Sequence, residues 1–321
     1  MGQERDICMK KYNEAKRRNQ EVQKYSKNYI SERMQRNVCD CGNWLDFIAS
    51  YEMDKHKLIT ANFCKWRFCP MCAMRKSMRD ALRISVLMQY IAAEQNKAFI
   101  FMTLTAPNVK KEGLRTEITR YNKAFKELMR KDEIAKMHFG FIRKLEITYN
   151  QERNDYHPHF HVVVAVNRGY FSGGRYVKRD RLLDLWREVM GDYSITQVDV
   201  RAVKKNKDKD TLAEGFDVAE FVKYAAKDSD YTQNEIVFDA FYTALKGRQV
   251  LTYSGLFATA NKKYKVGELE EYKKVDDTEY YWRIMYAWKG KKYNEKQRER
   301  ISEGDKLFLS MQGINVENTD L

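Results

Sequence analysis

The sequence predicts an α+β fold in which an antiparallel sheet carries helices on one face and a cysteine-rich module comes first. Strand-like and helix-like stretches follow one another in the order strand, helix, strand, strand, helix, strand, helix. That order is the one found in a ferredoxin-like split βαβ core, where the middle two strands pair as a hairpin. Five of the six cysteines precede this pattern, within residues 36–75, which sets that stretch apart as a separate module.

Residues 9–35 are rich in Lys, Arg, Glu and Gln and contain few branched apolar residues. This composition predicts a solvated helix that is frayed or in contact with nucleic acid. The expected organisation is a basic helical segment over 1–35, the cysteine-rich module over 36–75, the sheet domain over 76–260, and a charged C-terminal extension over 261–321.

The sheet domain begins with residues 76–96, where apolar residues recur at helical spacing. A buried strand is predicted next, over 99–105, and Pro107 ends it. The remaining elements follow from the same two periodicities. Helices are expected over 114–130, 179–190, 217–227 and 234–245, and strands over 140–149, 156–166 and 194–203. A later segment, 280–288, is aromatic enough to be an added strand.

The chain has 321 residues and a formal net charge of +14. This excess favours a polyanionic partner, of which nucleic acid is the commonest, although a solvated basic surface is the alternative. No apolar run approaches the roughly 20 residues that span a bilayer, and the polar N-terminus lacks the apolar stretch of a secretory signal. We therefore expect no membrane partner and a cytoplasmic location, where cysteines stay reduced.

Three of the five histidines alternate with other residues in the expected strand 156–166. Because side chains alternate along a strand, His157, His159 and His161 point to one face while Phe160 and Val162 point to the other. Such histidines are often merely exposed or hydrogen-bonded. Three of them at one end of a strand instead predict a divalent metal site, and in a basic protein the first substrate to consider is a phosphodiester.

A hard ion such as Mg²⁺ or Mn²⁺ also needs oxygen ligands, and Glu146 is the best candidate. It lies in the strand expected to pair with the histidine strand, on the same face as the histidines. Its ion would polarise and orient the scissile phosphate. His159 and His161 are the stronger histidine candidates. His157 precedes a proline at the strand entrance, and its alternative role is to support another ligand.

The predicted helix 217–227 places Glu220 and Tyr224 four residues apart, on one face. Tyrosine is a credible nucleophile towards phosphorus when a metal activates the phosphate, and Glu220 is a candidate base for a later attack by water. Lys223 and Lys227 are candidate phosphate contacts. With 21 tyrosines in the chain, ordinary packing is the alternative for Tyr224, and Tyr231 is the rival nucleophile.

The cysteine pattern predicts a tetrahedral structural zinc site, because a Cys-x-x-Cys pair follows three further cysteines of the module in a cytosolic context. The expected ligands are Cys41, Cys64, Cys69 and Cys72. Cys39 is the substitute and His56 a more distant one. Gly42 after a ligand eases the tight turn that such a site requires. Reduced cysteines without a metal are the alternative reading.

Two basic stretches are expected to be loops near the active site. They contact DNA phosphates if functional, or are simply solvated. The first contains Arg175, Lys178, Arg179 and Arg181, and the second Lys204, Lys205, Lys207 and Lys209. Aromatic residues of the first stretch could stack on exposed bases; they are Tyr170, Phe171 and Tyr176.

The motifs occur in the order found in HUH endonucleases, and the chain resembles the replication initiators of small rolling-circle plasmids from Gram-positive bacteria. The resemblance is to the branch that has one catalytic tyrosine and a glutamate four residues before it, and it covers roughly residues 36–260. The matching motifs are FMTLT (101–105), HPHFH (157–161), EFVKY (220–224), FCPMC (68–72) and SGLF (254–257).

This resemblance implies nicking of one strand at the double-strand origin of a plasmid. Tyr224 would stay joined to the 5′ end, the free 3′-OH would prime host polymerase, and Glu220 would activate water at termination. The implied partners are origin DNA, single-stranded or extruded as a hairpin at the nick site, and the host helicase and polymerase. Alternatives from other classes are a non-catalytic zinc-containing DNA-binding regulator and an HUH transposase or relaxase.

Overall fold

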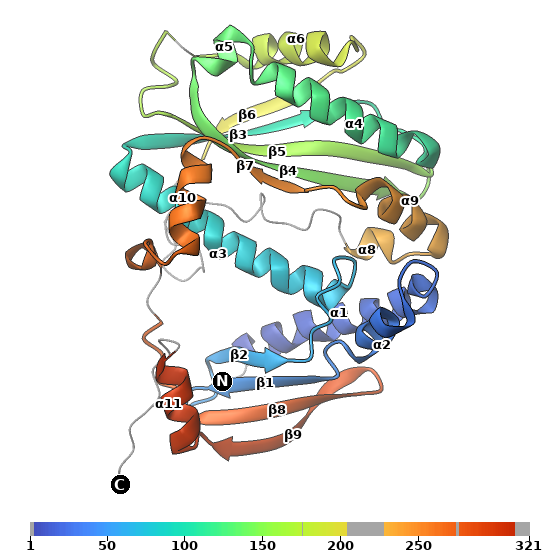
Figure 1. The fold of residues 1–321 in the computed structure, drawn as a ribbon, viewed down its shortest axis with the longest axis vertical. Helices are drawn as coiled ribbons and strands as arrows, with labels where there is room; N and C mark the ends of the chain where they lie inside the picture. The colour runs from blue at the N-terminus through green and yellow to red at the C-terminus, as the bar shows by residue number, and fades with distance from the viewer. Residues whose placement is uncertain (1–2, 175, 204–227, 274–275, 312–321) are drawn as a thin grey trace. The chain divides into compact units, whose positions relative to one another are not determined.

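The structure is a computed structural model that describes residues 3–174, 176–203, 228–273 and 276–311 (Figure 1). It divides the chain into two compact units. The first combines residues 1–75 with 275–321, and the second comprises residues 76–274. Each unit contains an antiparallel sheet and helices, and the predicted α+β class is therefore confirmed.

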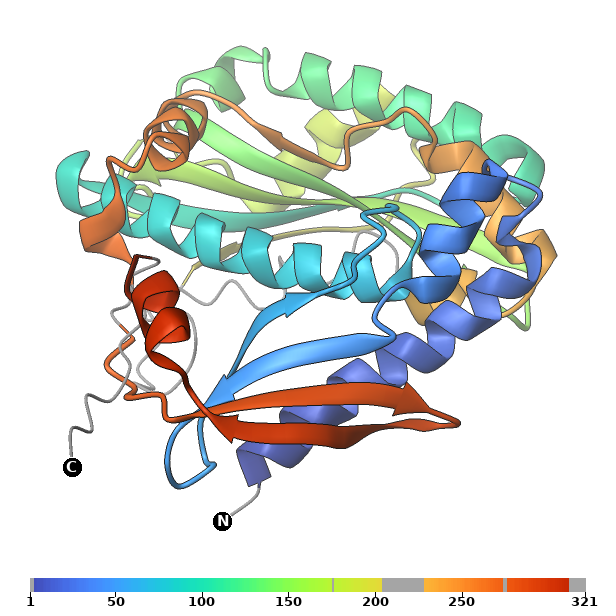
Figure 2. The same cartoon turned by 60° about the horizontal axis from the view of Figure 1, so that its bottom comes forward.

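The first unit joins the two ends of the chain in one four-stranded sheet with the order β2-β1-β8-β9. Figure 2 shows the β8–β9 hairpin beside the blue N-terminal strands. The strand expected over 280–288 is present as β8, whereas β1, β2 and β9 had no clear signal in the sequence. The elements are α1 (Gln3–Ser26), α2 (Glu32–Asp40), β1 (Trp44–Ala49), β2 (His56–Ala61), β8 (Trp282–Lys289), β9 (Lys292–Arg300) and α11 (Glu303–Met311).

Helix α1 is not the solvated helix that its composition predicted. Tyr12, Ala15 and Val22 on one face are buried, and the Tyr12 ring packs edge-on against Phe47 of β1 with centroids 5.6 Å apart. The same face also buries Lys16 and Asn19. These two polar residues occupy core positions. The buried face of α1 therefore lacks the regular spacing of apolar residues by which a buried helix is recognised in a sequence.

The second unit contains a five-stranded antiparallel sheet with the order β6-β3-β5-β4-β7. β5 lies between β3 and β4, and β3 lies between β5 and β6, which is the expected split βαβ arrangement extended by β7 at one edge. The strands are β3 (Lys97–Thr105), β4 (His138–Asn150), β5 (Asp155–Asn167), β6 (Val198–Ala202) and β7 (Leu251–Tyr253).

Helices of this unit cover both faces of the sheet (Figure 1). On one face Phe160 packs against Tyr121 and Phe125 of α4. On the other, Phe101 and Val163 share a core with α3 and α10. We expected helices on one face, and α3 and α10 add the second layer. The helices are α3 (Pro70–Glu94), α4 (Lys111–Leu128), α5 (Asp132–Ala135), α6 (Arg179–Met190), α8 (Asp228–Tyr231), α9 (Glu235–Leu245), α10 (Leu256–Lys265) and the 3₁₀ helix η1 (Glu270–Tyr272).

Most predicted elements of the sheet domain are present. The helices expected over 76–96, 114–130, 179–190 and 234–245 correspond to α3, α4, α6 and α9, and the four strands correspond to β3–β6. We predicted no element over 251–257, and the structure places β7 and the start of α10 there. The helix expected over 217–227 lies outside the described residues. Within the described part of the chain, no helix has the length and apolar character needed to cross a membrane.

Candidate metal centres

Two neighbouring strands, β4 and β5, bring a carboxylate and two histidines together on the face of the sheet that also bears α3, and β3 adds a threonine beside them. In the β4–β5 pairing Glu146 lies opposite His159, and in the β3–β5 pairing Thr103 lies opposite His161. We call Glu146, His159 and His161 the acid–histidine group. Their alternation with core residues such as Leu145 and Phe160, which point to the other face, fixes this register.

The geometry of the acid–histidine group suits one divalent ion. Glu146 Oε2 lies 3.2 Å from His161 Nε2 and 3.9 Å from His159 Nε2. Two ligands that are each about 2.1 Å from one ion lie at most about 4.2 Å apart, so the three atoms can share an ion with little movement. All three side chains are buried, and one carboxylate oxygen with two imidazole nitrogens is a donor set that could hold a divalent metal ion.

The protonation states also favour metal binding. Burial, reinforced by the neighbouring His161, lowers the pKa of His159 to about 4, so its imidazole is neutral and can donate a lone pair. Burial alone raises the pKa of Glu146. The hydrogen bond with His161 and the positive charge of Lys144 outweigh it, and the net pKa lies below the ordinary value. Glu146 is therefore a carboxylate at neutral pH.

The two imidazoles are oriented through their Nδ1 atoms. His161 Nδ1 lies 3.3 Å from Thr103 Oγ1, and His159 Nδ1 lies 3.3 Å from the backbone oxygen of His157. Such contacts leave the Nε2 atoms free to face Glu146, as is common for metal-binding histidines. We did not predict a role for Thr103. Its only signal in the sequence is a polar residue within an apolar strand.

His157 does not join the acid–histidine group. Its ring lies 5.3 Å from the ring of His159, but its nitrogen atoms are not among the ligand atoms that cluster within 4.8 Å of one another. Its contact with the site is the backbone oxygen that faces His159 Nδ1. This geometry corresponds to the supporting role that we considered as the alternative.

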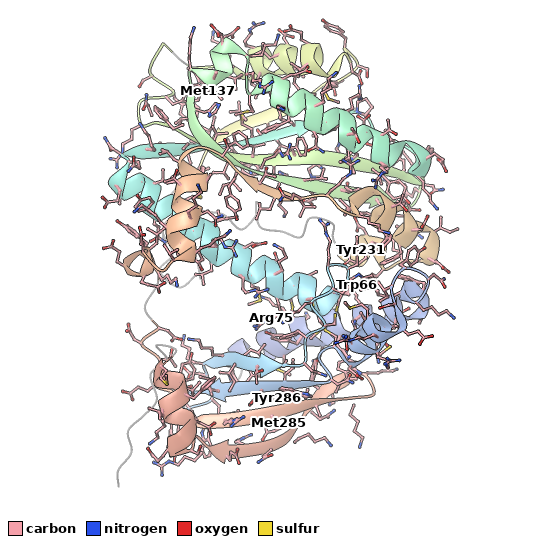
Figure 3. The ribbon with its side chains drawn as sticks, viewed as in Figure 1. Trp66, Arg75, Met137, Tyr231, Met285 and Tyr286 are labelled. Atoms are coloured by element: carbon pink, nitrogen blue, oxygen red, sulfur yellow. The ribbon has the colours of Figure 1, made fainter. Side chains whose placement is uncertain are left out.

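The rival nucleophile Tyr231 is enclosed by other residues (Figure 3). It is only 3% exposed, and its ring packs against Phe238 and Phe241. Its neighbour Asp230 accepts a hydrogen bond from the backbone nitrogen of Tyr149, 3.1 Å away, which attaches α8 to β4. The other residues of the predicted nucleophile helix lie outside the described residues; they are Glu220, Lys223, Tyr224 and Lys227.

The first basic loop lies at the far end of β5 from the acid–histidine group. It follows Asn167, six residues beyond His161, which corresponds to about 20 Å along a strand. Lys178 and Arg179 begin α6, and both are exposed. We had expected this loop near the active site. Arg175 and the second basic stretch lie outside the described residues; that stretch comprises Lys204, Lys205, Lys207 and Lys209.

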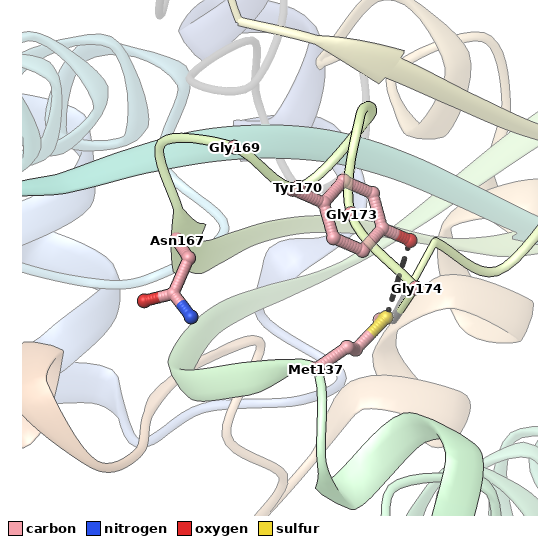
Figure 4. A pocket seen from close by; sticks show the side chains of 6 residues that line it. All are labelled: Met137, Asn167, Gly169, Tyr170, Gly173 and Gly174. Carbon is pink, nitrogen blue, oxygen red and sulfur yellow. Dashed lines mark hydrogen bonds between the residues drawn. The ribbon is translucent and has the colours of Figure 1, made fainter.

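The aromatic residues of this loop differ in exposure. Tyr170 is 4% exposed, and its hydroxyl accepts a hydrogen bond from Val177 N and donates one to Met137 Sδ, 3.3 Å away, at a small hollow (Figure 4). Phe171 and Tyr176 are 47% and 38% exposed. Tyr170 therefore braces the loop, whereas Phe171 and Tyr176 pack against it and against each other while remaining partly exposed.

In the other unit, the structure brings the four predicted cysteines together as a second cluster. Cys41, Cys64, Cys69 and Cys72 form the four-cysteine group, in which the Sγ–Sγ distances of Cys41–Cys69, Cys64–Cys72 and Cys41–Cys72 are 3.5, 3.6 and 3.7 Å. A tetrahedral zinc ion with Zn–S bonds of 2.3 Å separates its sulfurs by about 3.8 Å. The cysteines are free rather than disulfide-bonded, so the spacing fits a tetrathiolate metal site.

Backbone and helix geometry support thiolates at this position. The backbone nitrogens of Cys64 and Lys65 donate to Cys41 Sγ and Cys72 Sγ, and Cys72 lies in the first turn of α3, where the helix dipole favours negative charge. Hydrogen bonds from the neighbouring thiols lower the pKa of Cys72. Burial raises the pKa of Cys69, and the neighbouring thiols raise it further. Both effects arise because negative charge is costly in a buried and crowded position.

The tight turn expected after the first ligand is present. Gly42 has a φ of +68°, a conformation that glycine adopts without strain. A side chain there would also collide with Met71, since an added Cβ would lie 2.6 Å from its Cε atom. Cys39 remains outside the four-cysteine group, and its thiol accepts a long contact from Gln35 Nε2, at 3.7 Å.

Comparison with known proteins identifies relatives over most of the chain. Residues 55–296 match the family model described as "Replication protein". "Protein rep" of Staphylococcus aureus is 47% identical over 228 residues, which cover 71% of this chain and 96% of the relative. "Protein rep" of a Bacillus species is 34% identical over 252 residues, which cover 73% and 81%. The comparison with solved structures found no match.

Proposed function

The chain belongs to the Rep_1 family of rolling-circle plasmid replication proteins, and from this membership we propose that it nicks one strand of its plasmid's double-strand origin. The proposed reaction is a metal-dependent transfer of a DNA phosphodiester to a tyrosine, carried out by residues 76–260. The observation that carries this proposal is the acid–histidine group, because a buried carboxylate beside two imidazoles is a ready site for a divalent ion.

The acid–histidine group would hold Mg²⁺ or Mn²⁺, which when bound polarises a non-bridging phosphate oxygen and offsets its charge. Glu146, His159 and His161 fix the position of that oxygen relative to the sheet. Thr103 and the backbone of His157 keep the imidazoles aligned through their Nδ1 atoms. The strand phosphate must reach this face as single-stranded DNA, which an extruded hairpin at the origin would supply.

We propose Tyr224 as the nucleophile. Asp230 is attached to Tyr149, which is three residues from Glu146 along β4. Tyr224 precedes Asp230 by six residues, a stretch that spans at most about 22 Å when extended. The chain length therefore allows the Tyr224 hydroxyl to reach the acid–histidine group, while the burial of Tyr231 disfavours the rival.

In the nicking step the phenolic oxygen of Tyr224 forms a bond to phosphorus and the bond from phosphorus to the 3′ oxygen breaks. The 5′ end stays on the tyrosine, and the 3′ oxygen leaves as a hydroxyl that can prime host polymerase behind the host helicase. At termination Glu220 takes a proton from water, which then cleaves the regenerated site. Strand transfer onto the phosphotyrosine releases a closed single-stranded circle.

Basic side chains are proposed to hold the DNA, and the four-cysteine group to hold a structural zinc ion. Lys223 and Lys227 would contact phosphates next to the nick. Lys178 and Arg179, together with Arg175, would contact DNA farther along, because their loop follows the opposite end of β5. Zinc would stabilise the first unit without taking part in the transfer.

A suicide substrate tests this function. A single-stranded oligonucleotide that carries the origin nick site is incubated with the protein and Mn²⁺, and the products are separated under denaturing conditions. We expect a covalent protein–DNA band that Tyr224→Phe abolishes and Tyr231→Phe retains. Stoichiometric DNA binding without any covalent band would instead identify a non-catalytic regulator, and loss of the band in Tyr231→Phe alone would overturn the assigned nucleophile.

A further inference from the structure

Lys16 of α1 is a buried cation next to the four-cysteine group. Its side chain is 1% exposed, and its Nζ donates to the backbone oxygen of Cys41 at 2.6 Å and to Asn43 Oδ1 at 2.8 Å. The acceptors that the structure gives it are neutral oxygens. Burial of an ammonium group is costly unless an opposite charge compensates it. The carboxylate of Asp40 contributes some negative charge, but the sulfurs of Cys41 and Cys69 would act on Lys16 more strongly as thiolates.

Asn19 contacts the same group from the same face of α1, since residues three apart on a helix are neighbours. It is 0% exposed, and its Nδ2 donates to Cys69 Sγ at 3.3 Å. The amide orientation is held by Gln23, whose Nε2 donates to Asn19 Oδ1 at 2.7 Å. Helix α1 thus presents one positive charge and one N–H donor to the sulfurs.

A metal-bound tetrathiolate supplies the missing anion. Four thiolates around one divalent ion carry a net charge of minus two, which is costly to bury without compensation. The two buried features explain each other: Lys16 lies where the excess negative charge would be, and Asn19 donates to one of the sulfurs. With four neutral thiols, Asp40 alone among these neighbours would supply a negative charge to the Lys16 ammonium, and its influence is smaller than that of Cys41 and Cys69 as thiolates.

We propose that Lys16 and Asn19 stabilise the metal-bound form of the four-cysteine group, and that α1 therefore docks firmly only when Zn²⁺ is bound. This inference rests on the proposed structural zinc. It gives the basic N-terminal helix a defined task as part of the metal site rather than as a DNA-contacting arm. Lys16 and Asn19 act here as positioning residues, through the sulfurs that would bind the ion.

The test uses the full chain and compares Lys16→Met and Asn19→Leu with the matched control Lys11→Met, an exposed lysine on the same helix. Zinc retention is measured by competition with a chelator, and Co²⁺ is substituted to record thiolate-to-metal charge-transfer bands. Loss of such outer contacts typically weakens metal binding by about 10–100-fold. For Lys16→Met and Asn19→Leu we expect zinc binding to weaken by this factor and the Co²⁺ charge-transfer band to shift. Lys16→Arg, which keeps the charge, should lose less affinity, and Lys11→Met should behave like the wild type.

Hydrogen exchange on the wild-type chain provides a readout that needs no substitution. Removal of zinc by a chelator should speed exchange of the α1 amides, and restored zinc should reverse it. If Lys16→Met does not fold, the exchange measurement alone tests whether docking of α1 depends on zinc. Equal α1 exchange with and without zinc, or wild-type affinity and spectra in both variants, would overturn the inference while the zinc site stands. A chain that binds neither Zn²⁺ nor Co²⁺ would overturn the zinc site itself.

Discussion

Individual polar groups, one on a side chain and one on the backbone, determine which atoms of the acid–histidine group face one another. Each imidazole has two nitrogens, and the partner of Nδ1 determines whether Nε2 is available to a metal. For His161 that partner is the Thr103 hydroxyl, and for His159 it is the backbone oxygen of His157. The histidine pattern is visible in the sequence, but these orienting contacts depend on strand pairing.

Thr103→Val should weaken metal binding at the acid–histidine group without removing a ligand. The change deletes the hydroxyl that faces His161 Nδ1 and keeps the shape, so we expect about a 10-fold higher Mn²⁺ concentration for half-maximal nicking. Thr105→Val is the matched control, because its hydroxyl donates to the Gln197 backbone oxygen instead. An unchanged Mn²⁺ dependence in Thr103→Val would remove Thr103 from the site.

Glu146→Gln should have a larger effect, because it removes the only carboxylate of the acid–histidine group while keeping its size. We expect the covalent band to fall by at least about 100-fold at saturating DNA, in line with the loss of a metal ligand. Glu152→Gln, an exposed residue in the β4–β5 turn, serves as the control. Equal activity in Glu146→Gln and Glu152→Gln would argue against a metal at this position.

At the scale of elements, α8 is attached to β4 directly after residues 204–227, which lie outside the described part of the chain. The contact is the hydrogen bond that Asp230 accepts from Tyr149. This bond holds the chain that follows Tyr224 next to the strand that carries Glu146. If Tyr224 is the nucleophile, as we propose, this anchor limits how far from the acid–histidine group it can lie.

Asp230→Ala should slow nicking with little effect on metal binding, since it releases α8 from β4. We expect the rate of adduct formation to fall by about 10-fold or more, because small misplacements of reacting groups are costly. Gln233→Ala, an exposed change close by, is the control. If Asp230→Ala nicks at the wild-type rate, this anchor does not position the nucleophile.

At the scale of the whole chain, the first unit depends on residues that are far apart in sequence. Arg283 of β8 donates to both oxygens of Asp46 in β1 and to Asp305 of α11. Asp46 is 1% exposed, so its charge needs this partner. The pairing of β1 with β8 makes the C-terminal stretch part of the sheet rather than an appendage.

Arg283→Met should destabilise the first unit by about 3 kcal/mol, the lower end for a broken buried ion pair, because Arg283 itself is partly exposed. Urea unfolding followed by circular dichroism measures this loss. Arg298→Met breaks a more exposed pair with Glu295 and should cost less than about 1 kcal/mol. The double variant Arg283→Met with Asp46→Asn should recover part of the stability, and additive losses would contradict the coupling.

Asp276 gives the same unit a dependence on pH. Burial alone raises the pKa of Asp276, but the hydrogen bonds from Lys57, Thr278 and Tyr280 outweigh it, and the net pKa is lowered. A lowered carboxyl pKa adds stability that is present above the unfolded value, near 4, and is lost as pH falls through the folded value. Asp276→Asn should therefore flatten the loss of unfolding free energy below pH 4, with Asp277→Asn as the control.

The sequence by itself determined the elements of the sheet domain and most of the ligand candidates. Alternation along β5 places the histidines on one face, and apolar spacing marks the helices, because both patterns are local. Glu146 followed from expecting the two strands to pair. The spacing of the cysteines likewise indicated a four-ligand site before any distance was known.

Only the tertiary structure decided the contacts that join distant segments. No local pattern shows that β8 pairs with β1, that Thr103 faces His161, or that the polar residues Lys16 and Asn19 belong in a core. Composition marked α1 as solvated, but buried polar side chains are tolerated where the fold offers them hydrogen-bond partners, as it does for Lys16 and Asn19. The local periodicities built the elements, and long-range electrostatic and hydrogen-bond complementarity determined which of their faces are buried.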